Sequence, residues 1–252
     1  MEELPVKVSY LFGMHPVIEA IAAGRQIEKV LIRDNHEGPQ FRELLAIVSE
    51  ANIPYSYAPQ QKLDALAKGG RHQGVVAMIA PIDYVPLEEM IANAKKSEEC
   101  PIFVMLDGVS DVRNLGAIAR TAECVGASGI IVPAKGGAAI NSEGIKASAG
   151  ALLRMGVAKV QNLKIASLML KAEGFKIIAA SEKTDNFIYN VDMTGPIAIV
   201  MGAEGKGVSK TMLALSDELA AIPMAGQISS LNVSVAASVV LYEAVRQRIA
   251  EN

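Results

Sequence analysis

The stretch LDGVSDVRNLGAIARTAE, from Leu106 to Glu123, decides the fold, because an apolar strand ends in it and a helix begins in it. Two later segments follow the same plan, with small and polar residues after an apolar strand: IVMGAEGKGVS (Ile199–Ser209) and IPMAGQISSLNVSV (Ile222–Val235). In open α/β sheets, ligands bind just beyond the carboxyl ends of the strands. We therefore expect the polar residues of the three segments to gather at one such edge; they are Asn114, Arg120, Glu204, Ser230 and Asn232.

The C-terminal part of the chain alternates short apolar runs with segments of helical period. Strands are predicted near residues 102–107, 129–132, 157–160, 176–180, 197–201 and 219–222, and a last helix near 231–249. Strands that alternate with helices form a mostly parallel sheet that is covered on both faces. The last helix is apolar nearly all round in its first half, so we expect it to be buried, in the core or against a second subunit.

A smaller α/β domain is predicted upstream. The pattern gives helices at residues 15–23, 40–51 and 59–67, and strands at 28–33, 55–58 and 75–80. Pro81 and Pro86 then interrupt the chain, and a polar-faced helix from Glu88 to Lys96 ends in a charged run. We expect a first domain over residues 1–80, a linker over 81–100 and a second domain over 101–252.

The composition excludes several classes of protein. No apolar run reaches the roughly 20 residues that span a bilayer, and MEELPVKV at the start lacks the regions of a signal peptide, so a cytoplasmic protein is expected. Cys100 and Cys124 are too few and too isolated for a disulfide framework or a zinc site, and no metal is expected.

The charge balance bears on nucleic-acid binding. The net charge of -3 argues against a protein that coats nucleic acid indiscriminately, because Lys and Arg contacts to phosphate supply most non-specific affinity. A selective RNA enzyme with a local basic surface remains compatible with it. Candidate cations for such a surface are Arg25, Lys29, Arg33, Lys62, Lys68, Arg71, Arg113, Lys135 and Lys146.

The glycine-rich segment fails the best-known nucleotide signatures. Its glycines, from Gly202 to Gly207, have the spacing of a phosphate-binding P-loop, but Val208 stands where that loop requires lysine. The stretch after the strand that ends at Asp107 likewise lacks the G-x-G-x-x-G of dinucleotide sites. What remains is a glycine-rich turn that lets the backbone approach a ligand closely.

The three segments resemble the three motifs of the SpoU family of RNA ribose 2′-O-methyltransferases, which belongs to the knotted SPOUT class. The start LFGMHPVIEAI (Leu11–Ile21) and His72-Gln73-Gly74 resemble the small RNA-binding domain of one branch, which methylates a guanosine in bacterial large-subunit ribosomal RNA. The resemblance implies a trefoil knot in the C-terminal α/β domain and a homodimer with the cofactor pocket at its interface. It implies S-adenosylmethionine as the cofactor, held around Gly202, Ile222, Met224 and Leu231, with Pro223 shaping the loop.

The resemblance gives Arg120 the central part, either as an unusual base or as a clamp on the phosphate beside the target ribose. A guanidinium has a pKa above about 12 and resists deprotonation. Bidentate contact with phosphate suits its geometry, so we favour the clamp. The proton of the attacking hydroxyl would pass to solvent or to a phosphate oxygen, and the sequence does not choose between them.

Plainer roles stay open for the other candidates. Asn114 is a favoured N-cap residue for the helix that begins GAIARTAE, and Glu204 can satisfy backbone donors at a helix start. Ser230 and Asn232 can cap the last helix. In the first domain, a turn at Arg71 and His72 offers donors to RNA, and Arg113 offers a cation near the main site; His15 is more simply a polar cap.

Three functions remain open on the sequence alone. The favoured one is methylation of a guanosine 2′-hydroxyl in 23S ribosomal RNA. The second is the same chemistry on transfer RNA or on another ribosomal nucleotide, including one that confers antibiotic resistance. The third is a non-catalytic RNA-binding assembly factor, which the presence of all five polar motif residues disfavours.

Overall fold

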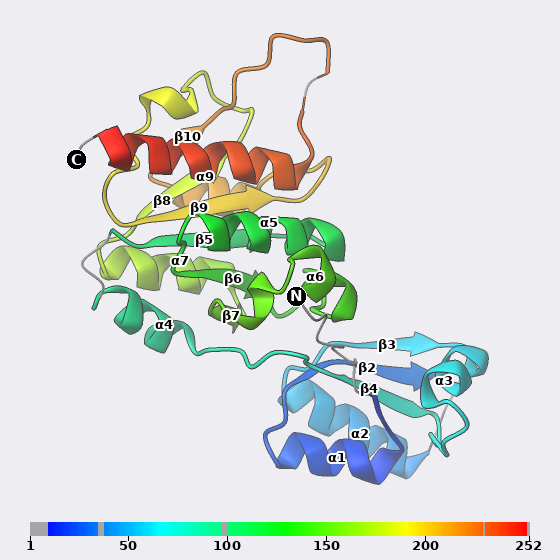
Figure 1. Ribbon diagram of the computed structural model, residues 1–252. Helices are drawn as coiled ribbons and strands as arrows, with labels where there is room; N and C mark the ends of the chain where they lie inside the picture. The colour runs from blue at the N-terminus through cyan, green and yellow to red at the C-terminus, as the bar shows by residue number, and fades with distance from the viewer. Residues whose placement is uncertain (1–9, 35–37, 97–99, 229, 251–252) are drawn as a thin grey trace. The chain divides into compact units, whose positions relative to one another are not determined.

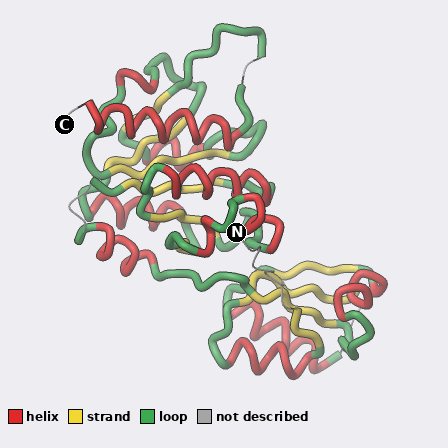
Figure 2. Tube along the Cα trace, in the orientation of Figure 1, coloured by secondary structure: helices red, strands yellow, loops and turns green. Residues whose placement is uncertain are grey.

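The computed structural model describes residues 10–34, 38–96, 100–228 and 230–250. It divides into two compact units, one over residues 10–83 with 139–142, the other over 84–138 and from 143 on. Each unit is built on one sheet, as the yellow strands in Figure 2 show. The predicted α/β class with a small N-terminal domain is confirmed.

The first unit is a four-stranded sheet with the order β1-β4-β2-β3. Its β4 runs antiparallel to β1 and β2, whereas β2 and β3 are parallel. The helices α1 and α2 pack on one face around Val17 and Leu44, and α3 packs on the other through Leu63. The elements are β1 (Tyr10–Phe12), α1 (Met14–Ala22), β2 (Ile27–Arg33), α2 (Pro39–Glu50), β3 (Tyr55–Ala58), α3 (Gln60–Ala67) and β4 (Val75–Ile79).

The second unit is a six-stranded sheet with the order β10-β8-β9-β5-β6-β7, and each of its strand pairs is parallel. Its strands are β5 (Ile102–Asp107), β6 (Gly129–Pro133), β7 (Val157–Val160), β8 (Lys176–Ala180), β9 (Ile197–Gly202) and β10 (Glu218–Ala220). Its helices are α4 (Leu87–Ala94), α5 (Val112–Cys124), α6 (Ser142–Ala147), α7 (Leu163–Ala172), α8 (Lys210–Leu215) and α9 (Val233–Ala250), with short 3-10 turns at Ala151–Leu153 and Ile188–Asn190.

The strand order creates a point where the topology reverses. The chain goes from β5 to its neighbour β6 and then to the edge strand β7. It next crosses to β8 on the other side of β5, and β9 then fills the position between β8 and β5 (Figure 1). Because all six strands are parallel, their carboxyl ends share one edge, and such a reversal opens a crevice there. This edge holds the candidate site.

Helices cover both faces of the large sheet. On one face, α4, α7 and α8 share a core with the strands, built around Met90, Leu170 and Met212. The predicted linker over residues 81–100 thus contains α4, whose apolar side chains are part of that core. Elsewhere α5 packs along α9 (Figure 1), and the hydroxyls of Thr121 and Ser238 are hydrogen-bonded at 2.9 Å.

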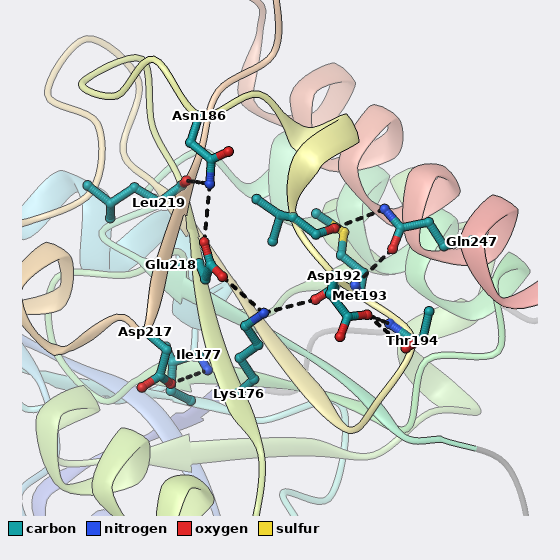
Figure 3. Close-up of polar contacts among 11 residues, drawn as sticks. Lys176, Ile177, Asn186, Asp192, Met193, Thr194, Asp217, Glu218, Leu219 and Gln247 are labelled. Carbon is teal, nitrogen blue, oxygen red and sulfur yellow. Dashed lines mark hydrogen bonds and ion pairs between the residues drawn. The ribbon is translucent and has the colours of Figure 1, made fainter.

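A polar cluster fixes the short edge strand β10 against β8 (Figure 3). Lys176 on β8 donates through Nζ to the backbone oxygen of Asp192 and pairs with Glu218 on β10, both at 3.2 Å. Asp217 accepts the backbone N–H of Ile177 at 2.8 Å and is paired with Lys171 on α7. Because β10 has only three residues, it makes few backbone hydrogen bonds to β8, and these side-chain contacts help to hold it in register.

Two elements add to what the sequence predicts. The strand β1 was not predicted, because only three residues form it and its partner is the distant β4. The last helix was expected to be buried in the core or against a second subunit, and Val235 in its first half is 48% exposed in the described chain. Val233, Ala237 and Val240 do lie in the core.

Candidate functional site

A cavity of about 450 Å³ lies at the carboxyl ends of β8, β9 and β10. Three segments far apart in sequence form it: the end of β8, the loop after β9, and the stretch between β10 and α9. Its walls are Ala180, Ser181, Glu182, Met201, Gly202, Ala203, Glu204, Gly205, Gly207, Ala220, Ile222, Met224, Ser230, Leu231, Asn232, Val233 and Ala236. This is the edge to which the sequence assigned its polar residues.

Most of the predicted residues line this cavity. Of the cofactor candidates, Gly202, Ile222, Met224 and Leu231 are in its wall, as are Glu204, Ser230 and Asn232. Pro223, Asn114 and Arg120 are not lining residues.

Asn114 reaches the site through hydrogen bonds. Its Nδ2 donates to Oε1 of Glu204 at 3.0 Å, and its Oδ1 accepts Nδ2 of Asn232 at 3.0 Å. Asn232 also donates to Oε1 of Glu204, at 2.7 Å. One residue from each of the three motif segments thus joins a single network beside the cavity.

The helix caps differ from the plain readings of these residues. The helix α5 begins at Val112, and its N-cap is Asp111, whose carboxylate accepts the backbone N–H groups of Arg113 and Asn114 at 2.8 and 2.9 Å. Asn114 is therefore not the cap, and its amide is left for the network. Asn232 does cap α9, since its Oδ1 accepts the backbone N–H of Ser234 at 2.9 Å.

Arg120 lies on α5 with its side chain exposed. Among the residues that the structure describes, it has no hydrogen-bond or ion-pair partner. An unpaired guanidinium on a helix surface keeps its donors available to a ligand. Arg120 is thus not part of the hydrogen-bond network that contains Asn114.

Close backbone packing shapes the loop after β9. A Cβ on Gly202 would lie 2.1 Å from the backbone C of Gly207 and the backbone N of Val208, so only glycine fits there. The loop closes on itself through reciprocal backbone hydrogen bonds between Ala203 and Gly207. Asp107, at the end of β5, accepts the N–H of Ser209 at 2.7 Å and anchors the loop to the neighbouring strand.

Sequence reasoning missed several site residues. Ser181 and Glu182 follow β8 and line the cavity, and Asp107 anchors the loop. In the sequence, each of these residues is a polar residue at or just after the end of a predicted strand. The local pattern does not show, however, that β8 lies next to β9. Glu182 and Glu204 give the cavity two carboxylates, so it favours a cationic ligand group.

The predicted RNA contacts lie elsewhere. Arg71 is exposed in the first unit, and His72 is buried, with Nε2 2.8 Å from Oδ1 of Asp64. Arg113 on α5 is paired with Glu143, and the hydrogen bond to that carboxylate raises the pKa of Arg113.

Two features are absent from the described residues, a metal-binding cluster and a membrane-spanning helix. No group of three or more His, Cys, Asp or Glu side chains in the described part of the chain is arranged to hold a metal ion. Within the same residues, no helix combines the length and the apolar character needed to cross a bilayer.

Two family profiles match the chain, one in each unit. The SpoU rRNA methylase family matches residues 101–242, and the domain for RNA 2′-O ribose methyltransferase substrate binding matches residues 10–85. YacO of Bacillus subtilis, which is named as a TrmH family tRNA/rRNA methyltransferase, is 35% identical over 239 residues, which are 95% of this chain and 96% of YacO.

Solved structures agree with the family profiles. The SpoU methyltransferase AviRb of Streptomyces viridochromogenes superposes with a TM-score of 0.62 at 26% identity, over 97% of this chain and 91% of AviRb. A second AviRb structure, in complex with the cofactor AdoMet, has a TM-score of 0.60 at 27% identity, over 96% and 90% of the two chains. The expected cofactor is the one present in that complex. The match over both units shows that the chain belongs to the SpoU rRNA methylase family.

Proposed function

We propose that this protein transfers a methyl group from S-adenosylmethionine to the ribose 2′-hydroxyl of a guanosine in 23S ribosomal RNA, as in the branch of the family that RlmB represents. The observation that carries the proposal is the network of Asn114, Glu204 and Asn232 at the wall of the cavity. The N-terminal unit, which matches a substrate-binding domain, favours ribosomal RNA, because the simplest transfer-RNA members lack such a domain.

The cavity suits S-adenosylmethionine in size and chemistry. Its volume of about 450 Å³ lies within the range of roughly 300–1,000 Å³ that is typical of small-molecule sites. Ile222, Met224 and Leu231 offer apolar contact to a flat base, and the crowded turn at Gly202 brings backbone to the wall. The carboxylates of Glu182 and Glu204 match the positive charges of the sulfonium and ammonium groups.

When bound, the cofactor would supply an electrophilic sulfonium methyl group; its transfer to the ribose 2′-oxygen would break the S–CH3 bond and leave a neutral thioether, while the hydroxyl proton would pass to solvent or to a phosphate oxygen. A sugar hydroxyl is a poor nucleophile, so the chain's contribution is to position it. Hydrogen bonds among Asn114, Glu204 and Asn232 fix the rotamers of these three side chains beside the cavity. Held in this way, their polar atoms are oriented toward the ribose. Arg120 clamps an adjacent phosphate, which requires the RNA to extend to the exposed face of α5.

We propose further that the active form is a homodimer formed through α9, within the knotted architecture that the resemblance implies. Val235, Tyr242 and Ile249 recur every seven residues on this helix and are 48%, 54% and 70% exposed. This spacing places them on one stripe, the pattern of a helix seam that packs on a partner. Light scattering should give twice the mass of 26.6 kDa, and Tyr242→Glu should yield monomers.

The test of function is transfer of labelled methyl from S-adenosylmethionine to unmethylated bacterial 23S rRNA, with the product mapped by nuclease digestion and mass spectrometry. A single 2′-O-methylguanosine supports the proposal. Methylation only of transfer RNA, or of another ribosomal nucleotide, would establish the second candidate. Cofactor binding without transfer to any RNA would instead indicate an assembly factor.

A further inference from the structure

A second cavity, of about 460 Å³, lies within the N-terminal unit. It is at the edge where β1 and β2 end and the antiparallel β4 begins, as the pairings Phe12 with Val76 and Ile32 with Val75 show. The segments that follow the strands supply its walls: the start of α1, the end of β2, the starts of α2 and α3, and the turn 70–74 before β4.

The chemistry of this cavity is opposite to that of the first. Its lining includes two guanidinium groups, Arg33 and Arg71, and the imidazole of His15. Three side-chain amides also face it, from Gln40, Gln60 and Gln73. A wall of cations and amides favours an anion with hydroxyl groups beside it, whereas the carboxylates of the first cavity favour a cation.

His72 determines how the turn presents Arg71. The backbone N–H of Gly74 donates to Nδ1 of His72 at 3.0 Å, so the ring proton is on Nε2 and donates to Asp64 at 2.8 Å. Both ring nitrogens of this buried side chain are therefore engaged. His72 is a positioning residue, and it also occupies the carboxylate of Asp64, which is the acidic residue among those lining the cavity.

The two arginines differ in what holds them. Arg33 donates through Nη1 to Oε1 of Gln60 at 3.1 Å, which orients its guanidinium plane. Arg71 is exposed and has no hydrogen-bond or ion-pair partner within the described residues. The helices α1, α2 and α3 begin at this edge; the first N–H of α1, at Met14, donates to Oε1 of Gln73 at 3.4 Å, whereas the N-cap residues of α2 and α3 make no side-chain cap bond, which adds to the positive potential of the edge.

We propose that this cavity binds a phosphodiester of the RNA backbone, with Arg71 as the bidentate phosphate contact and the glutamine amides at the adjoining ribose. The inference rests on the proposed function, since it takes RNA as the substrate. It adds which part of the N-terminal unit contacts the RNA. RNA is recognised largely through phosphate and 2′-hydroxyl contacts, and a guanidinium fits phosphate geometry.

The test compares Arg71→Gln with a matched control, Arg42→Gln. Arg42 is also exposed and lies in the same unit, on α2, but it does not line the cavity. Affinity of the full chain for a fluorescently labelled hairpin RNA is measured by anisotropy across a range of salt concentrations. Arg71→Gln should weaken binding several-fold and reduce the slope of log affinity against log salt by about 0.7–0.9, the value for one phosphate contact. The control should change neither.

A direct probe of the cavity is inorganic phosphate. The chain has three histidines, and two of them, His15 and His72, line this cavity, so their ring NMR signals report its occupancy. Phosphate should shift both signals in the wild type and not in Arg71→Gln. If phosphate shifts them while the variant binds RNA like the control, the cavity is a site for a free phosphate compound, and the RNA assignment is overturned.

The outcomes separate this inference from the proposed function. Equal RNA binding by the two variants, with methyl transfer intact, overturns the cavity assignment and leaves the methyltransferase proposal standing. Absence of methyl transfer to any RNA defeats the methyltransferase proposal, but selective loss of hairpin binding in Arg71→Gln would still support the cavity. Cofactor affinity, measured by calorimetry, should be the same in both variants.

Discussion

Nδ2 of Asn232 donates to Oε1 of Glu204 across 2.7 Å, while Oδ1 of the same side chain accepts the backbone N–H groups of Ser234 and Val235 in the first turn of α9. The Asn232 amide therefore caps α9 at the end of the loop in the third motif segment, and it orients the Glu204 carboxylate of the second segment. Because its oxygen is committed to the helix, its nitrogen is forced to point at Glu204 and Asn114. Helix capping and site geometry are coupled in one residue.

Substitution of Asn232 should separate the two roles. Serine is also a good N-cap, so the free energy of unfolding of Asn232→Ser should be close to that of the wild type. The serine hydroxyl is, however, too short to reach Glu204. Methyl transfer by this variant should fall by about 100-fold, because displacement of positioned groups by about 1 Å has that effect. Asn232→Ala should lose the same activity and in addition about 1 kcal/mol of stability. Urea unfolding and a methyl-transfer assay measure both; equal stability of the two variants would argue against the cap.

Arg120→Ala should abolish methyl transfer and leave the dissociation constant for S-adenosylmethionine within a few-fold of wild type. The reason is that Arg120 does not line the cofactor cavity, and its proposed partner is RNA. Arg120→Lys should fail nearly as badly, because lysine is a point charge that cannot form a bidentate clamp. Single-turnover transfer and calorimetry are the measurements.

The control for Arg120 is Arg154→Ala, which removes another exposed cation outside the cavity. It should retain transfer. Lost cofactor binding in Arg120→Ala would make this residue structural, and near-normal turnover of Arg120→Lys would contradict the clamp.

Much of the fold was predictable because its strands are short runs of mainly apolar residues. The strand at 102–107 and its counterparts at 157–160 and 176–180 were predicted with the bounds that the structure has. Buried parallel strands give this strong signal, since both faces are covered. The three-residue β1 gives no such signal, because its stability comes from pairing with β4, far along the chain.

The site was predictable to the level of its edge, but not of its contacts. Glu204 and Asn232 were expected at the carboxyl ends of strands, and they lie there. That Asn114 bonds both of them, and that Glu182 joins the cavity, depends on the order β8-β9-β5, which no local pattern encodes. The cap at Asp111 was likewise missed, because Asn114 is an equally favoured cap type.

Gly202→Ala should damage both stability and cofactor binding. The added Cβ would lie 2.1 Å from the backbone of Gly207 and Val208, so the loop after β9 must move. Overpacking of this kind costs about 1–3 kcal/mol, and the displaced loop is a wall of the cofactor cavity. Gly195→Ala is the control, since no atom lies within 4 Å of its added Cβ. Thermal unfolding with and without S-adenosylmethionine tests both variants; an unchanged ligand-induced shift in Gly202→Ala would remove this glycine from the site.

The polar cluster at β10 should make part of the stability depend on pH. Burial alone would raise the pKa of Asp217, but a hydrogen bond from Lys171, one from the backbone N–H of Ile177, and the positive charges of Lys171 and Lys176 outweigh it and hold the pKa below its usual value. Figure 3 shows the bond from Ile177. A carboxyl whose pKa is lowered by folding stabilises the protein above its unfolded pKa of about 3.9, and this stabilisation disappears as the pH falls through the folded pKa.

Asp217→Asn should therefore lower the free energy of unfolding at neutral pH, by about 1 kcal/mol or less, since the side chain is 39% exposed and exposed ion pairs contribute little. The difference between wild type and variant should stay constant from neutral pH down to about pH 4 and then shrink. Urea unfolding across this range, with Asp185→Asn as an exposed control outside the cluster, measures it. A difference that grew as the pH fell would mean that Asp217 is destabilised when charged, and that burial rather than the two lysines and the Ile177 N–H sets its behaviour.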